Sequence, residues 1–321
     1  MKALPFFRAI TRFGGSRVGM RPVRDVGRLA VTFMLLAGLT AALSSPAIQP
    51  AAAQQTDTQE PAPPQAAPGV VRVQFEARMT QNGPAINSGM EWRIFPAHAS
   101  EDGDLPLLAQ AQGGVQAFDM SPGEYLVHAA YGYAGAVRRI VVSPSTTQEI
   151  FALNAGALQL YATTGDDRRI PPRFLRFDIY SRQANEAGER QLIARNIRPG
   201  EIVPFHSGIY HVVSLYGRLN AEVRADLRVE PGKVTRATIQ HRAARMAFRL
   251  VHTAGGDAIA NTAWSIINES GDLITESSSA FPAFVLSEGN YTAIAKNSDK
   301  IYSSDFEVVS GKDREIEVRA E

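Results

Sequence analysis

The chain has 321 residues, of which 45% are hydrophobic, so it is long enough for two or three domains with cores of their own. Its 33 basic and 32 acidic residues nearly balance, but the first 53 positions hold seven of the basic residues and one of the acidic ones. The rest of the chain is mildly acidic, which argues against a nucleic-acid-binding protein. There is no cysteine, so disulfides, thiolate chemistry and Cys-containing zinc sites are excluded, and packed cores alone must hold the domains together.

Residues 1–53 predict an export signal. An apolar run at 29–43 follows a basic stretch, and three alanines follow at 51–53. This order is typical of a secretory signal peptide, here cleaved after Ala53. The apolar run is shorter than the roughly 20 residues that cross a bilayer. The basic stretch is long if translation starts at Met1, and a start at Met20 would give a more ordinary signal.

Residues 54–69 are rich in Gln, Pro and Ala and have no apolar period, so we expect a disordered linker before the first domain. The signal predicts a periplasmic or secreted protein, in the envelope of a Gram-negative bacterium. The alternative is an uncleaved anchor in the inner membrane, and the membrane would then be contacted through this segment alone.

A unit of about 80 residues occurs three times after residue 69. Each copy has a Gly-x-Tyr motif, and an aromatic-x-Ile motif precedes it. The Gly-x-Tyr motifs begin at Gly123, Gly208 and Gly289, and the aromatic-x-Ile motifs begin at Trp92, Phe177 and Trp264. A fixed period indicates that one supersecondary unit has been duplicated. The predicted domains are residues 70–155, 156–244 and 245–321.

Short alternating segments fill each repeat. The first repeat opens with a strand at 71–75, continues with one at 90–95, and has a hairpin formed by 125–131 and 136–142. Turn residues recur between these segments, and no helical run longer than a turn or two stands out after residue 53. The pattern predicts an all-β protein of three tandem antiparallel sandwich domains, Ig-like or prealbumin-like.

The tyrosine of each Gly-x-Tyr motif begins an alternation that would face a core. A tyrosine in that place buries its ring and needs a backbone partner for its hydroxyl. The alternative is an exposed tyrosine that stacks on a ligand. Because the motif recurs in all three repeats, a shared core explains it better than a shared site.

Residues 121–127, Ser-Pro-Gly-Glu-Tyr-Leu-Val, resemble the Pro-Gly-x-Tyr strand of carboxypeptidase-regulatory-like and Cna-B-type domains. These are prealbumin-like, seven-stranded sandwiches found as repeats on exported proteins, and the other two repeats match the motif less closely. The resemblance implies a scaffolding, adhesive or ligand-presenting role without catalysis. Cna-B-type domains often carry a Lys–Asn isopeptide cross-link with its lysine on the first strand. No repeat here has a lysine there, so we expect no such cross-link.

Motifs for catalysis or metal binding are missing from the sequence. The six histidines form no zinc motif, and neither a Gly-x-Ser-x-Gly elbow nor a phosphate-binding glycine loop is present. His206 and His211 could converge on a metal with a loop carboxylate, although their spacing fits two ordinary histidines better. We therefore predict no catalytic, metal-binding or cofactor-binding residue, and no cofactor.

Two features could form a binding surface. Tyr-Gly pairs lie at equivalent hairpin tips of the first two repeats, and the third repeat has Asn297-Ser298 there. Arginines cluster in one loop of the second repeat, where an anionic glycolipid is a possible ligand. The alternatives are turn packing for the tyrosines and solvated edge positions for the arginines. The candidate ligand-contact residues are Tyr131, Tyr133, Tyr216, Arg168, Arg169 and Arg173.

The sequence thus predicts an exported, non-catalytic envelope protein that acts as a binding or spacer module. Its expected partner is an envelope protein or a glycan, and not a nucleic acid. The alternative is a periplasmic enzyme or enzyme inhibitor with a site between domains. Function is expected where the repeats differ: the Tyr-Gly tips, the loop at 97–114 and the arginine-rich segment at 165–173.

Overall fold

The computed structural model describes residues 69–100 and 102–320. The predicted signal peptide and nearly all of the predicted linker lie outside these residues. Strands dominate the described part, and its one helical element is a short 3-10 helix, η1 (Pro172–Phe174). No helix in the described part is long and apolar enough to cross a lipid bilayer.

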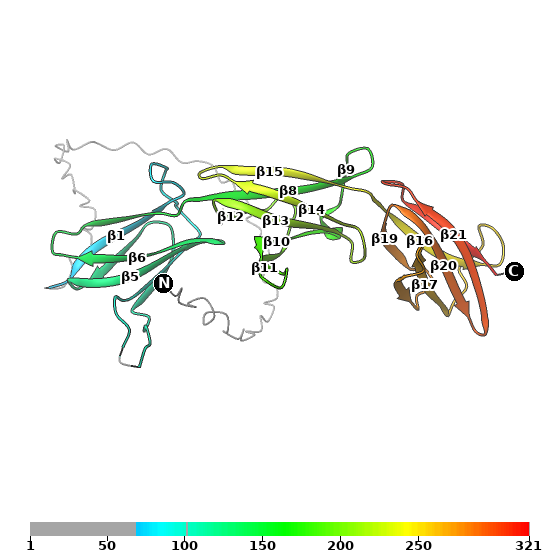
Figure 1. Ribbon diagram of the computed structural model, residues 1–321, viewed down its shortest axis with the longest axis horizontal. Helices are drawn as coiled ribbons and strands as arrows, with labels where there is room; N and C mark the ends of the chain where they lie inside the picture. Colours follow the sequence, from blue (N-terminus) through cyan, green and yellow to red (C-terminus); the bar gives the residue numbers. More distant parts are fainter. Residues whose placement is uncertain (1–68, 101, 321) are drawn as a thin grey trace, which may run out of the picture. The chain divides into compact units, whose positions relative to one another are not determined.

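Three β-sandwiches follow one another along the chain, and Figure 1 shows them in cyan-green, green-yellow and orange-red. In the first, a three-stranded sheet of order β4-β1-β7 faces a four-stranded sheet of order β3-β2-β5-β6. Its strands are β1 (Val71–Arg78), β2 (Met90–Pro96), β3 (Ala109–Gly113), β4 (Gln116–Met120), β5 (Gly123–Tyr131), β6 (Ala134–Val142) and β7 (Gln148–Ala152).

The second sandwich repeats this arrangement, with sheets of order β12-β8-β15 and β11-β10-β13-β14. A short additional strand, β9, pairs with the end of β8. The strands are β8 (Ala155–Thr164), β9 (Arg168–Arg169), β10 (Leu175–Ala184), β11 (Arg190–Ile197), β12 (Ile202–His206), β13 (Gly208–Tyr216), β14 (Glu222–Val229) and β15 (Val234–His241).

The third sandwich has sheets of order β19-β16-β22 and β18-β17-β20-β21. Its strands are β16 (Ala243–Val251), β17 (Thr262–Asn268), β18 (Leu273–Ser277), β19 (Ala283–Ser287), β20 (Gly289–Asn297), β21 (Lys300–Val308) and β22 (Arg314–Arg319).

The prediction of an all-β chain of tandem sandwiches is confirmed, with one difference in strand direction. In each sandwich the first strand pairs in parallel with the last one, and every other strand pair is antiparallel. Parallel strands need a long crossover connection, and here the intervening strands supply it. The first strand is the centre of its sheet, and β8 and β16 are nearly continuously buried.

Aromatic residues fill the middle of each core. Trp92 in the first sandwich packs edge-on to Phe151, and Trp264 in the third packs against Phe248. Phe177 occupies the corresponding place in the second sandwich, and all five rings are at most 1% exposed. The aromatic-x-Ile motifs therefore mark the second strand of each sandwich, where the aromatic residue is buried between the sheets.

The core interpretation of the Gly-x-Tyr motif is confirmed. In each copy the tyrosine hydroxyl donates a hydrogen bond to the carbonyl four residues earlier in the chain. These bonds are 2.9–3.0 Å long and join Tyr125 to Ser121, Tyr210 to His206 and Tyr291 to Ser287. The bond fixes the corner at which the chain passes from one sheet to the other, as in the tyrosine corner of other sandwiches. The motif is a structural device of the fold.

Successive sandwiches are joined directly. Two residues separate β7 from β8, and Arg242 alone separates β15 from β16. At both junctions a glycine of the later sandwich donates its backbone N–H to the carbonyl of the joining strand. These bonds are Gly232 to Ala155 at 2.7 Å and Gly311 to Ala243 at 2.9 Å. The two junctions are thus built from the same contacts.

Candidate functional site

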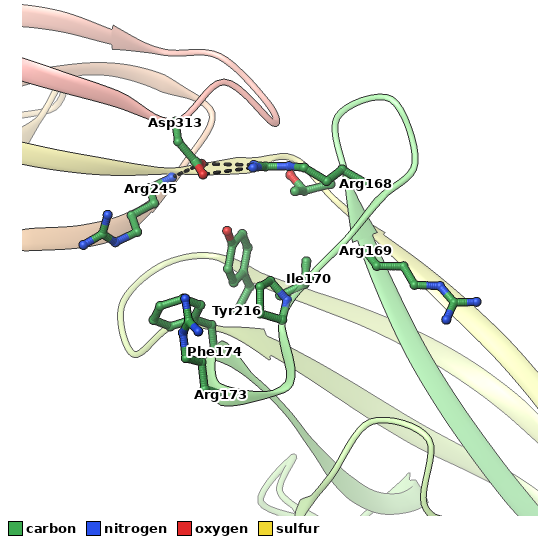
Figure 2. Close-up of a pocket in the computed structure, with 10 residues that line it drawn as sticks. Arg168, Arg169, Ile170, Arg173, Phe174, Tyr216, Arg245 and Asp313 are labelled. Carbon is green, nitrogen blue, oxygen red and sulfur yellow. Dashed lines mark hydrogen bonds and ion pairs between the residues drawn. The ribbon is translucent and has the colours of Figure 1, made fainter.

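A pocket of about 380 Å³ lies where the second and third sandwiches meet (Figure 2). Arginines, aromatic rings and one carboxylate share its wall. The lining residues are Thr164, Arg168, Arg169, Ile170, Pro171, Arg173, Phe174, Tyr216, Arg245 and Asp313.

The loop after β8 places most of these side chains. Gly165 takes a left-handed conformation (φ 59°), and a Cβ there would lie only 2.8 Å from Cα of Gly311, so a larger residue cannot be accommodated without movement. β9 then pairs back onto β8, and two prolines lead into η1. Prolines begin short helices well because their φ is already fixed. This rigid turn presents Ile170 and Phe174 to the pocket.

Arg168 and Asp313 form a two-pronged ion pair across the junction, with N–O distances of 3.0 and 3.1 Å. The Asp313 carboxylate also accepts the backbone N–H of Arg245 at 2.9 Å. Burial raises the pKa of Asp313, but the bonds from Arg168 and Arg245 outweigh it and leave the pKa below its usual range. The same pair raises the pKa of Arg168. Both side chains are 40–50% exposed, so the pair orients the loop more than it stabilises the fold.

The other three arginines have no carboxylate partner among residues 69–100 and 102–320. Arg173 lies over the ring of Phe174, 4.7 Å from its centroid, and Arg169 over that of Tyr161 at 5.6 Å. Figure 2 shows Arg173 and Arg245 on one side of Tyr216, while Arg169 extends away on the other. All four arginines line the pocket, and Arg168 is the one that is paired with a carboxylate in the described residues.

Tyr216 is at the back of the pocket and is 4% exposed. Its ring meets the His241 ring edge-on, with centroids 5.8 Å apart. Burial raises the pKa of the tyrosine, and the nearby Asp313 adds to this. The hydroxyl points toward the Arg168–Asp313 pair (Figure 2) and has no hydrogen-bond partner in the described part of the chain.

Four of the six residues predicted as ligand contacts thus line one pocket: Tyr216, Arg168, Arg169 and Arg173. The two others lie at the first junction. Tyr133 stacks on the buried ring of Phe205 in the second sandwich, with centroids 5.1 Å apart and an interplanar angle of 10°. Tyr131 is half-buried against the core of the first sandwich. The Tyr-Gly tips therefore pack against the sandwich that follows.

The first junction has a corresponding pocket, of about 290 Å³, and Tyr131 lines it as Tyr216 lines the other. Both tyrosines end the strand that the Gly-x-Tyr motif begins, β5 or β13, eight residues after its first glycine. The rest of this lining is uncharged: Met79, Thr80, Gly83, Pro84, Ala85, Ile86, Asn87, Ser88 and Gly232. The fold accounts for a pocket at each junction, but it does not require arginines there.

Sequence reasoning missed six lining residues: Thr164, Ile170, Pro171, Phe174, Arg245 and Asp313. Two of them could have been found by comparing the repeats. From the strand pairings, Arg245 corresponds to Ala157 in the second sandwich, and Asp313 to Val234. Each is a charge placed where the preceding copy is apolar.

The histidines considered as metal ligands have other partners. The backbone N–H of Gly135 donates to Nε2 of His206 at 3.1 Å, and His211 binds the carboxylate of Asp226 at 2.7 Å. No group of three histidine, aspartate or glutamate side chains in the described residues could hold a metal ion. Chemically, the arrangement at the second junction offers hydrogen-bond donors and positive charge.

Comparisons with known proteins add a relationship for the third sandwich. Residues 245–320 match a family model described as the Rhizobiales growth-associated tandem repeat domain. This family differs from the carboxypeptidase-regulatory-like domains whose motif the sequence resembles. A comparison with curated proteins finds no match.

Similar solved structures are found at low sequence identity. The Bacillus anthracis TIE protein is 16% identical (TM-score 0.22), and the alignment covers 78% of this chain and 51% of that one. The streptococcal ancillary pilin is 10% identical (TM-score 0.30; 78% and 98% covered). BcpA, the major pilin subunit of Bacillus cereus, is 10% identical (TM-score 0.23; 78% and 100% covered). The chain spans about half of the TIE protein. By its family match, the third sandwich is similar to a tandem repeat domain.

Proposed function

We propose that this protein is an exported, non-catalytic module of the bacterial envelope that binds an envelope protein or glycan. One observation carries the proposal: the arginines that distinguish the second repeat lie together at one junction, beside a tyrosine that both repeats share. Arg168, Arg173 and Tyr216 line the same pocket, and Arg245 and Asp313 of the third sandwich complete it. The equivalent pocket at the first junction carries no charge.

The junctions also support a spacer role. Connections of one and two residues leave little freedom between neighbouring sandwiches. Each hairpin tip contacts the next sandwich, since the backbone N–H of Tyr133 donates to the carbonyl of Pro204, and Val285 of β19 belongs to the core of the second sandwich. A binding site between two sandwiches held in this way would keep its shape under load.

Export and envelope location rest on the sequence of the first 53 residues, with its basic, apolar and small-residue segments. We propose a periplasmic location. The family model matched by the third sandwich is described as growth-associated, which fits a role in growth. Asp313 is the one carboxylate among the described residues that line the pocket, and Arg168 binds it, so the pocket favours binding over acid–base hydrolysis.

The test is in-cell cross-linking of the tagged full chain, followed by capture and identification of the partners. The variant Arg173→Gln/Arg245→Gln serves as a comparison, because it removes two charges without touching either core. Capture of an envelope protein or glycan by the wild type, reduced in the variant, supports the proposal. Recovery of no envelope component contradicts it.

A further inference from the structure

The pocket at the second junction has an unbalanced charge. Four arginines, Arg168, Arg169, Arg173 and Arg245, line it with one carboxylate, Asp313. Asp313 is already engaged by Arg168 and by the backbone N–H of Arg245. Positive charge at the wall therefore exceeds negative charge. Neighbouring cations repel each other, and a bound anion removes that cost.

Tyr216 supplies an independent observation. The residue is more than nine-tenths buried, but its hydroxyl is open to solvent and has no hydrogen-bond partner in residues 69–100 and 102–320. The corner tyrosines Tyr125, Tyr210 and Tyr291 all donate to a carbonyl. A hydroxyl that is open to the pocket can bond to a ligand oxygen in place of water.

The rest of the wall limits the shape of the ligand. Phe174, Ile170 and Pro171 form an apolar side, and Arg173 covers part of the Phe174 ring. A ligand that fits would have an anionic oxygen group next to a compact body that packs on this side, as a sugar ring does. Guanidinium groups bind both carboxylate and phosphate with paired hydrogen bonds.

We infer that this pocket binds an oxyanion, a carboxylate or a phosphate carried on a sugar-sized body, through Arg173, Arg245 and the hydroxyl of Tyr216. The inference rests on the proposed function, because it names the chemistry of the ligand at the same junction. Asp313 competes for Arg168 with the incoming anion. The first junction lacks these groups and does not bind.

The direct test is isothermal titration calorimetry at low ionic strength on the protein purified after expression of the full chain. Three probes of similar size separate the possibilities: glucuronate, glucose 6-phosphate and glucose. Binding of either anion with no binding of glucose supports the inference, and the tighter anion identifies the group. Because the contacts are charge-assisted, binding should weaken as salt is added. Equal binding of all three probes, or binding of none, overturns it.

Four variants locate the site. Arg173→Gln and Arg245→Gln should each weaken anion binding by about tenfold, since a charge-assisted contact is lost. Tyr216→Phe keeps the buried ring and should weaken it by roughly fivefold through loss of one neutral hydrogen bond. Asp313→Asn should tighten binding, because it frees Arg168 while the amide oxygen can still accept the N–H of Arg245.

Arg228→Gln is the matched control. Arg228 is exposed on β14, and its loss changes the net charge by the same amount. Unchanged affinity in this variant supports a defined site, while a loss as large as that of Arg173→Gln would mean diffuse attraction and would overturn the inference. Partner capture in cells that is equal for wild type and Arg173→Gln/Arg245→Gln would overturn the anion site and leave the binding function standing. Anion binding in vitro without any captured partner would support the anion site and contradict the proposed binding function.

Discussion

The hydroxyl of Ser214 and Nε2 of His241 lie 2.7 Å apart inside the second sandwich, where the serine is 0% and the histidine 1% exposed. In the first sandwich the corresponding positions are Ala129 and Leu153, both buried. The second sandwich has thus replaced an apolar pair by a hydrogen-bonded polar pair behind the pocket. Such a pair is tolerated because each member satisfies the other.

The pair makes the second sandwich sensitive to acid. Burial lowers the pKa of His241 from 6.5 to about 4, so the unfolded chain takes up a proton well before the folded chain does. Because the pKa of His241 is lower in the folded chain than in the unfolded chain, its contribution to stability is fully present above pH 6.5. This contribution is lost as the pH falls from 6.5 toward 4. Between pH 7 and pH 5 the free energy of unfolding should fall by about 2 kcal/mol from this residue. Urea unfolding followed by circular dichroism at the two pH values measures it.

The control for this prediction restores the arrangement of the first sandwich. Ser214→Ala/His241→Leu removes both polar groups together, so this part of the pH dependence should disappear. His241→Leu alone leaves the serine hydroxyl buried without a partner and should be less stable than the double variant by about 1–3 kcal/mol. A wild-type protein whose pH dependence matches that of the double variant would contradict the assignment to His241.

The two tryptophans offer a second comparison between copies. Nε1 of Trp92 donates to the carbonyl of Gly114 at 2.9 Å, whereas Nε1 of Trp264 is buried without a partner. Trp92→Phe should therefore cost about 1–2 kcal/mol more than Trp264→Phe, because it also leaves a buried carbonyl unsatisfied. Phe177 shows that this position accepts phenylalanine.

Hydrogen exchange measured by mass spectrometry on peptides from β2 and β17 reports the opening free energy of each sandwich separately. Each variant serves as the control for the other, since both replace the same side chain by the same smaller ring. Equal losses in the two sandwiches would show that the Trp92 hydrogen bond contributes nothing beyond ring packing.

The parts of the fold that could be predicted from the sequence depend on local periodicity. Gly-x-Tyr and the alternation after it place Val127 and Ala129 in the core, and the same pattern recurs with Val212 and Ser214. A strand's inward and outward faces follow directly from this period of two. Strand direction could not be read in this way, because the parallel pairing of β1 with β7 joins residues at opposite ends of a repeat.

The pocket was predictable only in part, because some of its residues are neighbours in the sequence and others are far apart. Arg168, Arg169 and Arg173 are neighbours in one loop, and their clustering is visible in the sequence. Asp313 lies 145 positions from Arg168, and nothing local connects the two. Tyr216 was expected at an exposed tip, but whether a hairpin tip meets solvent or the next sandwich is decided by the junction, which periodicity within one repeat does not describe.

The corner tyrosines predict unequal effects on stability. Tyr125 and Tyr210 each donate a single hydrogen bond, so their replacement by phenylalanine should cost about 1 kcal/mol. Tyr291 also accepts a bond of 2.8 Å from Nδ2 of Asn220, which belongs to the second sandwich. Asn220 in turn accepts the backbone N–H of Ser287 at 3.1 Å. Tyr291→Phe should therefore cost more and also weaken the junction.

Hydrogen exchange again separates the two effects. Tyr291→Phe should speed exchange in β19 and in the turn after β13, while Tyr125→Phe should affect its own corner alone. Asn220→Ala should reproduce the junction effect without removing the corner bond. If Tyr291→Phe and Tyr125→Phe have equal effects, the bond from Asn220 does not stabilise the junction.

The tip glycines provide a final prediction, about the junctions themselves. Gly132 and Gly217 have positive φ angles of 59° and 79°, and a Cβ on either would lie 2.8 Å from an atom of the next sandwich, in Pro204 and Val285 respectively. Alanine should therefore cost roughly 1 kcal/mol in backbone strain alone and push the neighbouring sandwich away. Ser298, at the same place in the third sandwich, already adopts a φ of 53° with a side chain present.

The two connections carry residues that different proteases recognise, so the two effects can be told apart. Arg242 joins the second and third sandwiches, and its side chain is 80% exposed, whereas buried Leu153 lies in the first connection. Gly217→Ala should speed tryptic cleavage after Arg242 and leave chymotryptic cleavage after Leu153 unchanged. Gly132→Ala should speed chymotryptic cleavage after Leu153 and leave tryptic cleavage after Arg242 unchanged. Ser298→Ala should change neither rate. Because cleavage follows local opening, a variant that speeds both cuts would indicate that the junctions open together.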